Sequence, residues 1–405
     1  DVWNAEEVEH DINLEGQRPL PKQTITLGKL MKKAGYKTSV VGKWGLGAPG
    51  TEGVATRQGF DYFYGYNCQR QAHNLYPVHL WENEEKVILN NEMVPWHTKL
   101  DESADFNDES NYAKFQQKEY APEKIHQKAL DFIKQNKDQP FFMYYASPLP
   151  HLPLQIPKKY VEKYRKLFGK EKPYSGNNGY FPNQYPRASY AAMISYMDAQ
   201  LGELITTLKE LGLYENTLIV FSSDNGPTYT GGVDTEFFNS ARPFSNDYGR
   251  TKGFVYEGGI RVPMIASWPN HIAPKTTNDH ISAFYDVLPT ICDIVGITIP
   301  EDIDGISFKP VLLGKKQKEH NFLYWEFPSY KGQQAVRMGK WKAIRKNIFE
   351  GNMDIELYDL EVDLKEKNNV SKQFPEIVDK IRIIMEEEHV PSSNEKFKFK
   401  ELGDE

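Results

Sequence analysis

The sequence contains only two cysteines in 405 residues, and neither stands in a CxxC pair. It therefore carries no signature of a structural zinc site or of a disulfide-rich framework. Cys68 and Cys292 are expected to be two structural thiols, although a single disulfide between them stays open. No apolar run approaches ~18 residues, so no transmembrane segment is expected. The chain also lacks an initiator methionine and begins with Asp1, so any leader would lie upstream.

The chain also has no excess of basic residues. The sequence has 49 Lys and Arg residues against 56 Asp and Glu residues, for a formal net charge of -7. A phosphate backbone would be repelled on average, so no nucleic-acid partner is expected. Hydrophobic residues make up 39% of the chain, which is ordinary for a globular protein. The 13% of aromatic residues fits either a well-filled core or a cleft for a sugar or aryl group.

Apolar runs alternate with amphipathic segments along the first three quarters of the chain. Their periodicity predicts helices at 26–34, 122–137, 187–213 and 285–295, and strands at 38–41, 141–146, 217–221 and 262–267. Strands that are apolar along their whole length are typical of parallel sheets buried on both faces. The alternation therefore predicts an α/β fold with a mainly parallel sheet sandwiched by helices.

The pattern changes near residue 314. Residues 321–359 alternate with a period of two, and an amphipathic stretch follows at 375–388. This predicts a small antiparallel sheet covered by one helix. We accordingly expect a catalytic domain at 1–315 and a C-terminal α+β subdomain at 316–405. The polar stretch at 66–120 has little periodicity and is expected to be a long surface excursion that shapes a substrate site.

Chemically useful side chains stand directly after three of the predicted strands. Lys43 follows the first strand, His151 follows the second, and Asp224 with Asn225 follows the third. Ligands of open parallel sheets bind at the carboxyl ends of the strands. We therefore expect these residues to contribute to one site.

Each of these residue types has a plain structural alternative. Asp224 and Asn225 offer hard oxygen ligands for Ca²⁺ or Mg²⁺, but Asp-Asn-Gly is also a common turn. Lys43 and Lys252 suit the oxygens of a sulfate or phosphate, whereas a single lysine is usually a solvated surface residue. His151 lies in a proline-rich loop, where it could protonate a leaving group or simply be structural.

Four ordered segments together resemble the sulfatase family of the alkaline-phosphatase superfamily. They are AGYKTSVVGKWGLG (34–47), SPLPHLPL (147–154), VFSSDNGP (220–227) and TKGFVYEGGIRVPMI (251–265), and GQRPLP (16–21) resembles a linker of that family. Any one of these motifs is weak, but the ordered set is specific and covers nearly the whole chain. The resemblance implies an alkaline-phosphatase-like fold and hydrolysis of sulfate esters, with a sulfated small molecule or glycan as substrate.

The resemblance also implies roles for particular residues. Asp224 and Asn225 would bind calcium, Lys43 and Lys252 would contact the sulfate group, and His151 would sit at the ester oxygen. His73, in QAHN (71–74), resembles a substrate-contacting residue of bacterial members. Relatives of this kind are periplasmic, secreted or otherwise exported, so we expect export here too.

Two departures from the family pattern stand out. Family members usually read G-K-W-H-L-G, but Gly45 occupies the histidine position here. The family nucleophile is a formylglycine made from Cys or Ser in C/S-x-P/A-x-R, and neither Cys68 nor Cys292 lies in such a motif. We therefore expect the formylglycine, and two further aspartates of the calcium site, upstream of residue 1. The chain alone is then expected to be inactive, with an incomplete calcium shell.

Two other functions remain open from the sequence. A phosphoester or phosphonate hydrolase of the same superfamily would bind a tetrahedral anion of similar size. A non-catalytic protein that binds sulfated glycans would keep the pocket and lose the chemistry, and Gly45 favours this alternative.

Overall fold

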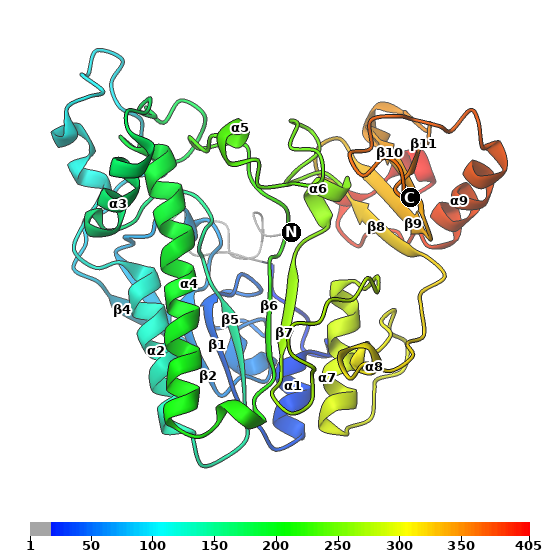
Figure 1. The fold of residues 1–405 in the computed structure, drawn as a ribbon, viewed down its shortest axis with the longest axis horizontal. Coiled ribbons are helices and arrows are strands. Elements are labelled where there is room, and N and C mark those ends of the chain that lie inside the picture. The colour runs from blue at the N-terminus through cyan, green and yellow to red at the C-terminus, as the bar shows by residue number, and fades with distance from the viewer. Residues whose placement is uncertain (1–17) are drawn as a thin grey trace. The chain divides into compact units, whose positions relative to one another are not determined.

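The computed structural model describes residues 18–405, which form two compact units. The first unit runs to Thr217 and also contains Thr230–Val233, while the second comprises Leu218–Tyr229 and Asp234–Glu405. Each unit is described by itself below, and Figure 1 shows their elements. The expected division at residue 315 stays a prediction.

A five-stranded sheet forms the centre of the first unit. Its order is β4-β3-β2-β1-β5, with β1 at Lys37–Lys43, β2 at Tyr62–Tyr66, β3 at His79–Glu82, β4 at Glu85–Ile88 and β5 at Phe141–Ala146. Strand β1 pairs in parallel with both β2 and β5, whereas β3 pairs with β2, and β4 with β3, in antiparallel register. The parallel centre confirms the expected fold class, and β2, β3 and β4 are additions that the sequence pattern did not reveal.

Helix α2 (Ala121–Gln135) covers one face of this sheet. It begins with Pro122 in its first turn, and its Phe132 ring stacks on Tyr62 of β2 with centroids 6.2 Å apart. On the opposite face, Val40 and Phe63 belong to a buried cluster with Phe60. Helix α1 (Leu27–Lys33) packs there, because the Phe60 ring lies against its Gly28. The sheet is thus covered on both faces, as expected.

Longer helices complete the first unit. Helix α4 (Pro186–Glu210) runs beside α2 and packs against α3 (Lys158–Phe168) (Figure 1). Short 3₁₀ turns connect these elements, at Ala55–Gln58 (η1), Gln71–His73 (η2), Glu109–Phe115 (η3) and Tyr214–Asn216 (η4). The expected helices at 26–34, 122–137 and 187–213 are therefore present, whereas α3 was not foreseen.

The second unit begins with a two-stranded sheet. Strand β6 (Ile219–Ser222) pairs with β7 (Met264–Ser267) in antiparallel register, so these two expected strands form a sheet of their own. Both strands leave apolar side chains exposed, with Val220 at 43% and Ile265 at 62%. Helices follow at Thr235–Phe238 (α5), Glu257–Ile260 (α6), Val287–Val295 (α7) and Lys309–Leu312 (α8).

The C-terminal part of the second unit is a four-stranded antiparallel sheet in the order β11-β10-β9-β8. The strands are β8 (Leu323–Phe327), β9 (Gln333–Met338), β10 (Trp341–Lys346) and β11 (Glu356–Asp359), and α9 (Pro375–Glu387) packs on them. Val336 of β9 meets Ile381 and Met385 of α9 in one buried cluster. The small sheet with its covering helix is confirmed.

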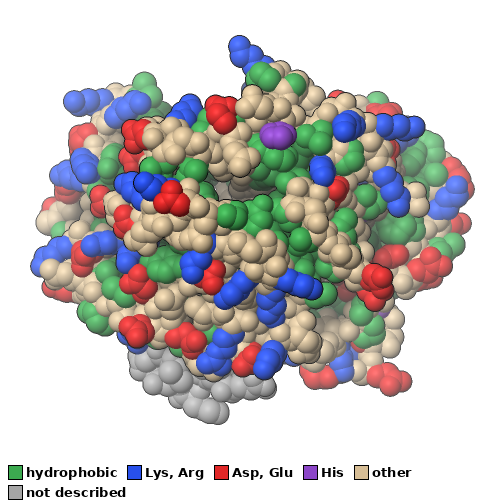
Figure 2. Space-filling view, turned by 90° about the horizontal axis from the view of Figure 1, so that it is seen from below, with side chains coloured by type: hydrophobic (Ala, Val, Ile, Leu, Met, Phe, Trp, Pro, Cys, Tyr) green, Lys and Arg blue, Asp and Glu red, His purple; other side chains and the backbone are tan. Residues whose placement is uncertain are grey.

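Cysteine and charge are distributed as the sequence suggests. Cys68 and Cys292 are both buried thiols. Basic and acidic side chains are interspersed on the face of the molecule shown in Figure 2. No helix in residues 18–405 combines the length and the apolar character needed to cross a membrane.

Candidate functional site

Lys43 lies at the carboxyl end of β1, next to the end of β5. The register pairs Gly42 with Ala146, so Lys43 and Ser147 leave the sheet side by side. Gly42 has a φ of 114°, and a Cβ there would come within 1.9 Å of the Ala146 carbonyl oxygen. Only glycine allows the two strands to approach in this way. The half-buried Lys43 is therefore positioned by a backbone contact that tolerates no side chain.

His151 is held in the loop that follows β5. Its backbone N–H donates to the Pro148 carbonyl at 3.0 Å, and its ring Nδ1 lies 2.7 Å from the Leu152 carbonyl oxygen. Because a carbonyl oxygen can only accept, Nδ1 carries a proton. In the neutral ring Nε2 is then the basic nitrogen, so this atom can take up a proton and give it to a leaving oxygen.

His73 lies against His151. Its ring stacks on the His151 ring with centroids 5.5 Å apart and an angle of 12° between the ring planes. The segment after His73 is tied to the first unit at two points, because Tyr66 Oη donates to the Asn74 carbonyl at 2.8 Å and Gln155 accepts from the Leu75 N–H at 2.7 Å. The structure thus brings these two predicted residues together within the first unit.

Two further rings, which the sequence reasoning missed, join this pair. The Tyr180 ring centroid lies 4.9 Å from that of His73 and 5.9 Å from that of His151. The His97 ring lies 5.6 Å from Tyr180, and Nδ1 of His97 accepts the Tyr180 N–H at 2.9 Å. Both residues lie in segments without apolar periodicity, so no sequence signal marks them.

Asp224 and Asn225 occupy the loop directly after β6 in the second unit. Asn225 Nδ2 donates to the Gly226 carbonyl at 2.8 Å, which fixes the orientation of its side-chain amide. The Gly226 N–H donates to the Gly259 carbonyl at 2.8 Å, and a Cβ on Gly226 would come within 1.9 Å of the Gly258 carbonyl oxygen. The loop is therefore packed tightly on the turn that contains α6.

Lys252 is joined to the same loop. Its backbone N–H donates to the Pro227 carbonyl at 3.1 Å, two residues beyond Asn225. The second unit thus gathers Asp224, Asn225 and Lys252 on two connected segments, with Asp224 exposed and the other two half-buried.

The donor set around Asp224 fits part of a calcium site. A carboxylate and a carboxamide oxygen on neighbouring residues are hard ligands, and the fixed Asn225 amide keeps its Oδ1 as the acceptor. Calcium takes about six to eight oxygens. Within residues 18–405, no group of three or more His, Cys, Asp or Glu side chains is placed to hold a metal ion. The two residues therefore fit calcium as two ligands of a larger shell.

A buried ion-pair network anchors the segment that carries Lys252. Glu257, in α6, lies 2.8 Å from Lys342 Nζ of β10, and the two side chains are 4% and 0% exposed. Burial alone would raise the pKa of Glu257, but Lys342, Arg337 and Arg261 bring it below its ordinary value. The Glu257 N–H in turn donates to Glu366 at 2.8 Å. These contacts fasten α6 to the C-terminal sheet.

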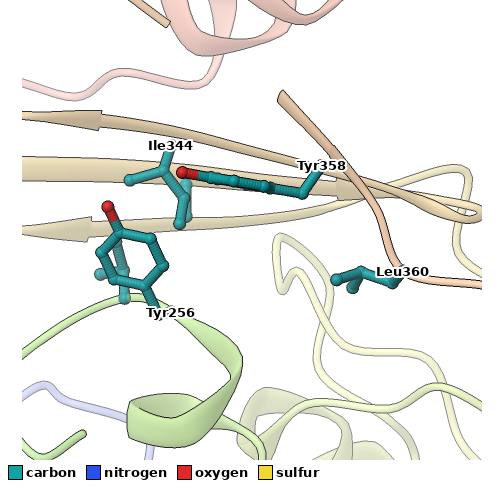
Figure 3. Close-up of a cluster of buried hydrophobic side chains, with 6 residues drawn as sticks. Tyr256, Ile344, Tyr358 and Leu360 are labelled. Atoms are coloured by element: carbon teal, nitrogen blue, oxygen red, sulfur yellow. The ribbon is translucent and has the colours of Figure 1, made fainter. Parts of the chain in front are cut away.

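Aromatic packing supports the same connection. Tyr256 enters a buried cluster with Ile344, Tyr358 and Leu360 of the C-terminal sheet region (Figure 3). Its hydroxyl donates to Glu356 at 2.6 Å, and Arg250 lies over its ring at 4.3 Å. Burial raises the pKa of Tyr256 far above its ordinary value, so the hydroxyl remains a donor. Lys252 therefore lies between two residues, Arg250 and Tyr256, that are fixed on the C-terminal sheet.

A cavity of about 640 Å³ in the first unit does not suit an anionic substrate. It is lined by the β3–β4 hairpin and its neighbours, including Asp61, Glu82, Glu84 and Glu85. Four carboxylates against one lysine, Lys86, give this lining an excess of negative charge, which disfavours a sulfate ester. The candidate residues at the strand ends are therefore the better place to look for the chemistry.

Comparison with protein families matches the sequence over most of its length. The family described as Sulfatase matches residues 4–297, and the C-terminal region of N-sulphoglucosamine sulphohydrolase matches residues 249–390. The chain belongs to the sulfatase family. The first match contains all six candidate residues, Lys43, His73, His151, Asp224, Asn225 and Lys252.

Individual sulfatases resemble the chain at moderate identity. Human arylsulfatase A is 31% identical over 352 residues, which cover 80% of this chain and 59% of that protein. N-acetylgalactosamine-6-O-sulfatase of Bacteroides thetaiotaomicron is 26% identical over 414 residues, covering 89% of this chain and 76% of the relative. The chain thus spans little more than half of the human sulfatase that it matches.

Solved structures confirm the fold of this sulfatase chain. The crystal structure of Ps i-CgsB superimposes with a TM-score of 0.70 and 25% identity, covering 92% of this chain and 75% of that one. The same protein in complex with k-i-k-neocarrahexaose gives a TM-score of 0.69 at 23% identity. These likenesses support the alkaline-phosphatase-like architecture expected from the sequence.

Two further features of the sequence are Gly45 and the GQRPLP stretch. Gly45 has a φ of 70°, a left-handed conformation that glycine adopts readily and histidine rarely does. The backbone at this position therefore suits the residue that is present. The GQRPLP stretch begins at Gly16 and Gln17, which lie outside the described residues.

Proposed function

We propose that the whole protein hydrolyses sulfate esters of a carbohydrate and releases inorganic sulfate. The observation that carries this proposal is the sulfatase family match over residues 4–297, which includes every candidate residue. The names of the relatives support a sugar substrate, since one is an N-acetylgalactosamine-6-O-sulfatase and another has been solved with a neocarrahexaose.

His151 is proposed to act on the leaving group. With Nδ1–H bound to the Leu152 carbonyl, the ring can carry a second proton on Nε2. As the bond between sulfur and the ester oxygen breaks, that proton passes to the departing alkoxide, which leaves as an alcohol. His73, stacked on the same ring, limits the orientations of the imidazole and is proposed to contact the substrate.

The two lysines are proposed to bind the sulfate group. An ammonium group stabilises the negative charge that sulfate oxygens carry during transfer. Lys43 is set by the close approach of β1 and β5, and Lys252 by the anchored 250–257 segment. Lys43 is thus tied to β5, and the loop that carries Lys252 to the C-terminal sheet, so little ordering is needed when the substrate binds.

Two groups that the resemblance implies would complete the site. Asp224 and Asn225 would hold a calcium ion, which would supply positive charge beside the sulfate oxygens. The nucleophile is proposed to be a formylglycine encoded upstream of residue 1, together with further aspartate ligands. On this basis residues 1–405 alone are expected to be inactive, and export of the whole protein also stays a prediction.

Sulfate release from defined esters tests the proposal. The full-length protein should release sulfate, measured by ion chromatography, from sulfated saccharides and should not release phosphate from matching phosphate esters. Release of phosphate at a comparable rate would favour a phosphoester hydrolase instead. Tight binding of sulfated saccharides without release of either anion would favour the non-catalytic alternative, for which Gly45 is the supporting feature.

A further inference from the structure

Four rings in the first unit form one continuous group. His73, His97, His151 and Tyr180 contact one another with centroid distances from 4.9 to 6.2 Å. His73 and His151 are assigned above to the reacting end of the substrate. His97 and Tyr180 therefore lie directly beside that end and have no role in the chemistry described so far.

The backbone holds these two residues in unusual conformations. His97 has a φ of 58° and Tyr180 a φ of 61°, both in the left-handed region. Such residues persist where surrounding contacts enforce them, and they cluster at ligand-binding sites. Here the Tyr180 N–H donates to His97, and Gly231 packs so closely that a Cβ would lie 2.9 Å from the Tyr180 ring. These two contacts hold the pair in its left-handed backbone conformations.

Arg70 and Trp96 are neighbours of this group along the chain. Trp96 precedes His97, and the Arg70 guanidinium lies over the Trp96 ring at 5.5 Å. Arg70 also directly precedes the η2 turn that carries His73. Arg70 is thus the chain neighbour of the turn that carries His73, and it stacks on the chain neighbour of His97.

The exposure of these residues suits recognition of a sugar. Arg70, Trp96 and Tyr180 are half-buried, and His97 is exposed. Half-buried rings offer one face to a ligand, and the planar guanidinium of an arginine matches the geometry of a sulfate or carboxylate. Because Nδ1 of His97 accepts from Tyr180, its Nε2 is protonated and can donate to a sugar hydroxyl.

We propose that Arg70, Trp96, His97 and Tyr180 form a subsite for a saccharide that carries a second anionic group beside the reacting sulfate. The proposal rests on the proposed function, because it places this subsite next to His73 and His151. The rings would pack on the apolar face of the sugar, and Arg70 would bind the second sulfate or carboxylate in a bidentate contact. The substrate class is accordingly a multiply charged glycan.

Binding to paired ligands tests the subsite without relying on turnover. Isothermal titration calorimetry of the full-length protein would use the monosulfated and disulfated forms of glucosamine and of neocarrabiose. In at least one pair the disulfated form should bind about tenfold more tightly or better, as expected for a charge-assisted contact. Arg70→Ala should abolish this preference, and Arg70→Lys should retain part of it because only the bidentate geometry is lost.

Arg57→Ala is the matched control, since Arg57 is another partly exposed arginine of the first unit and pairs with Glu52 and Glu84. It should leave the preference unchanged, and the thermal unfolding of Arg70→Ala should match that of the wild type. A lack of preference in both pairs, or a preference that survives Arg70→Ala, would overturn the subsite. Failure of the proposed function would look different: no sulfate would be released, whatever the binding preference.

Discussion

Lys342 Nζ lies 2.8 Å from Glu257 Oε1, and both side chains are almost completely removed from solvent. A buried charge that loses its partner is strongly destabilising, because the remaining charge has no water to replace it. In Lys342→Ala, Glu257 keeps Arg261 and Arg337 at 3.3 and 3.4 Å but loses its shortest and most buried partner. The free energy of unfolding should therefore fall by about 3 kcal/mol, the lower end of the range for a broken buried pair.

Urea denaturation would measure this change. Lys340→Ala is the control, because Lys340 pairs with Asp359 from a position that is 39% exposed, and such a pair contributes about 0–1 kcal/mol. The double variant Glu257→Gln with Lys342→Met should recover part of the lost stability, since neither buried charge is then left alone. Equal losses in Lys342→Ala and Lys340→Ala would contradict the importance of burial.

Glu366 makes stability depend on pH in the neutral range. Burial raises the pKa of this side chain to about 7 in the folded protein, from an ordinary value of 4.5. A raised pKa means that folding favours the protonated form, so the contribution is complete below about pH 4.5 and is lost as the pH rises toward 7. The full loss amounts to about 3 kcal/mol.

Glu366→Gln removes this titration while keeping a neutral side chain of similar shape. The wild type should lose stability relative to Glu366→Gln between pH 5 and 7, measured by urea midpoints at each pH. Glu361→Gln serves as a control, because Glu361 is an exposed residue nearby. Parallel pH profiles for the wild type and Glu366→Gln would show that Glu366 is ionised at pH 5.

Substitution of His151 should affect poor leaving groups most. A sugar alkoxide needs a proton as it departs, whereas a nitrophenolate leaves readily without one. In the full-length protein, His151→Gln should lower kcat on a sulfated sugar by about 10²–10⁴-fold and on nitrophenyl sulfate by much less. His280→Gln, in the second unit, should change neither rate. Equal losses on the two substrates would point to binding rather than proton transfer.

Asp224 should be required for calcium binding by the whole protein. Removing one carboxylate ligand takes away both an oxygen and the charge that attracts the ion. Titration calorimetry of the metal-stripped full-length protein should show an affinity at least tenfold lower for Asp224→Asn than for the wild type. Asp234→Asn, on the α5 N-cap, is the control and should bind calcium normally. Unchanged calcium affinity in Asp224→Asn would remove this residue from the proposed shell.

Gly42 should tolerate no side chain. A Cβ at this position would lie 1.9 Å from the Ala146 carbonyl oxygen, whereas a Cβ on Gly35 would meet nothing within 4 Å. Both glycines have positive φ, so Gly35→Ala measures the backbone strain alone, which is about 1–2 kcal/mol. Gly42→Ala should cost more than Gly35→Ala by thermal denaturation, and the difference measures the contact between β1 and β5. Equal costs would mean that β5 can move away at little expense.

The sequence predicts the continuous, strongly apolar elements well and the short polar strands poorly. Strand β5 and helix α2 lie close to their expected positions, because their apolar patterns are long and bounded by proline and polar residues. Strands β3 and β4 were missed, since each has only four residues and no clear alternation of apolar side chains. Strand β3 is joined to the sheet through β2, which is a tertiary partner that local propensity does not describe.

The candidate site likewise contains residues that the sequence indicates and residues that it does not. Lys43, His151 and the Asp224–Asn225 pair could be named as candidates because they follow predicted strands, and their roles stay predictions. His97 and Tyr180 could not, because nothing in their local sequence distinguishes them from other loop residues. What places them beside His73 is a backbone hydrogen bond between segments 83 residues apart.

The attachment of α6 to the C-terminal sheet has a consequence for the order of folding. Glu257 meets Lys342 and Glu366, which are separated from it by 85 and 109 residues. During synthesis the Lys252 segment therefore emerges from the ribosome well before the partners that fix it. Until then the carboxylate of Glu257 lacks Lys342 and its backbone N–H lacks Glu366, so the segment that carries Lys252 is without these anchors. We therefore expect the Lys252 segment to reach its final position only after the C-terminal sheet has been synthesised.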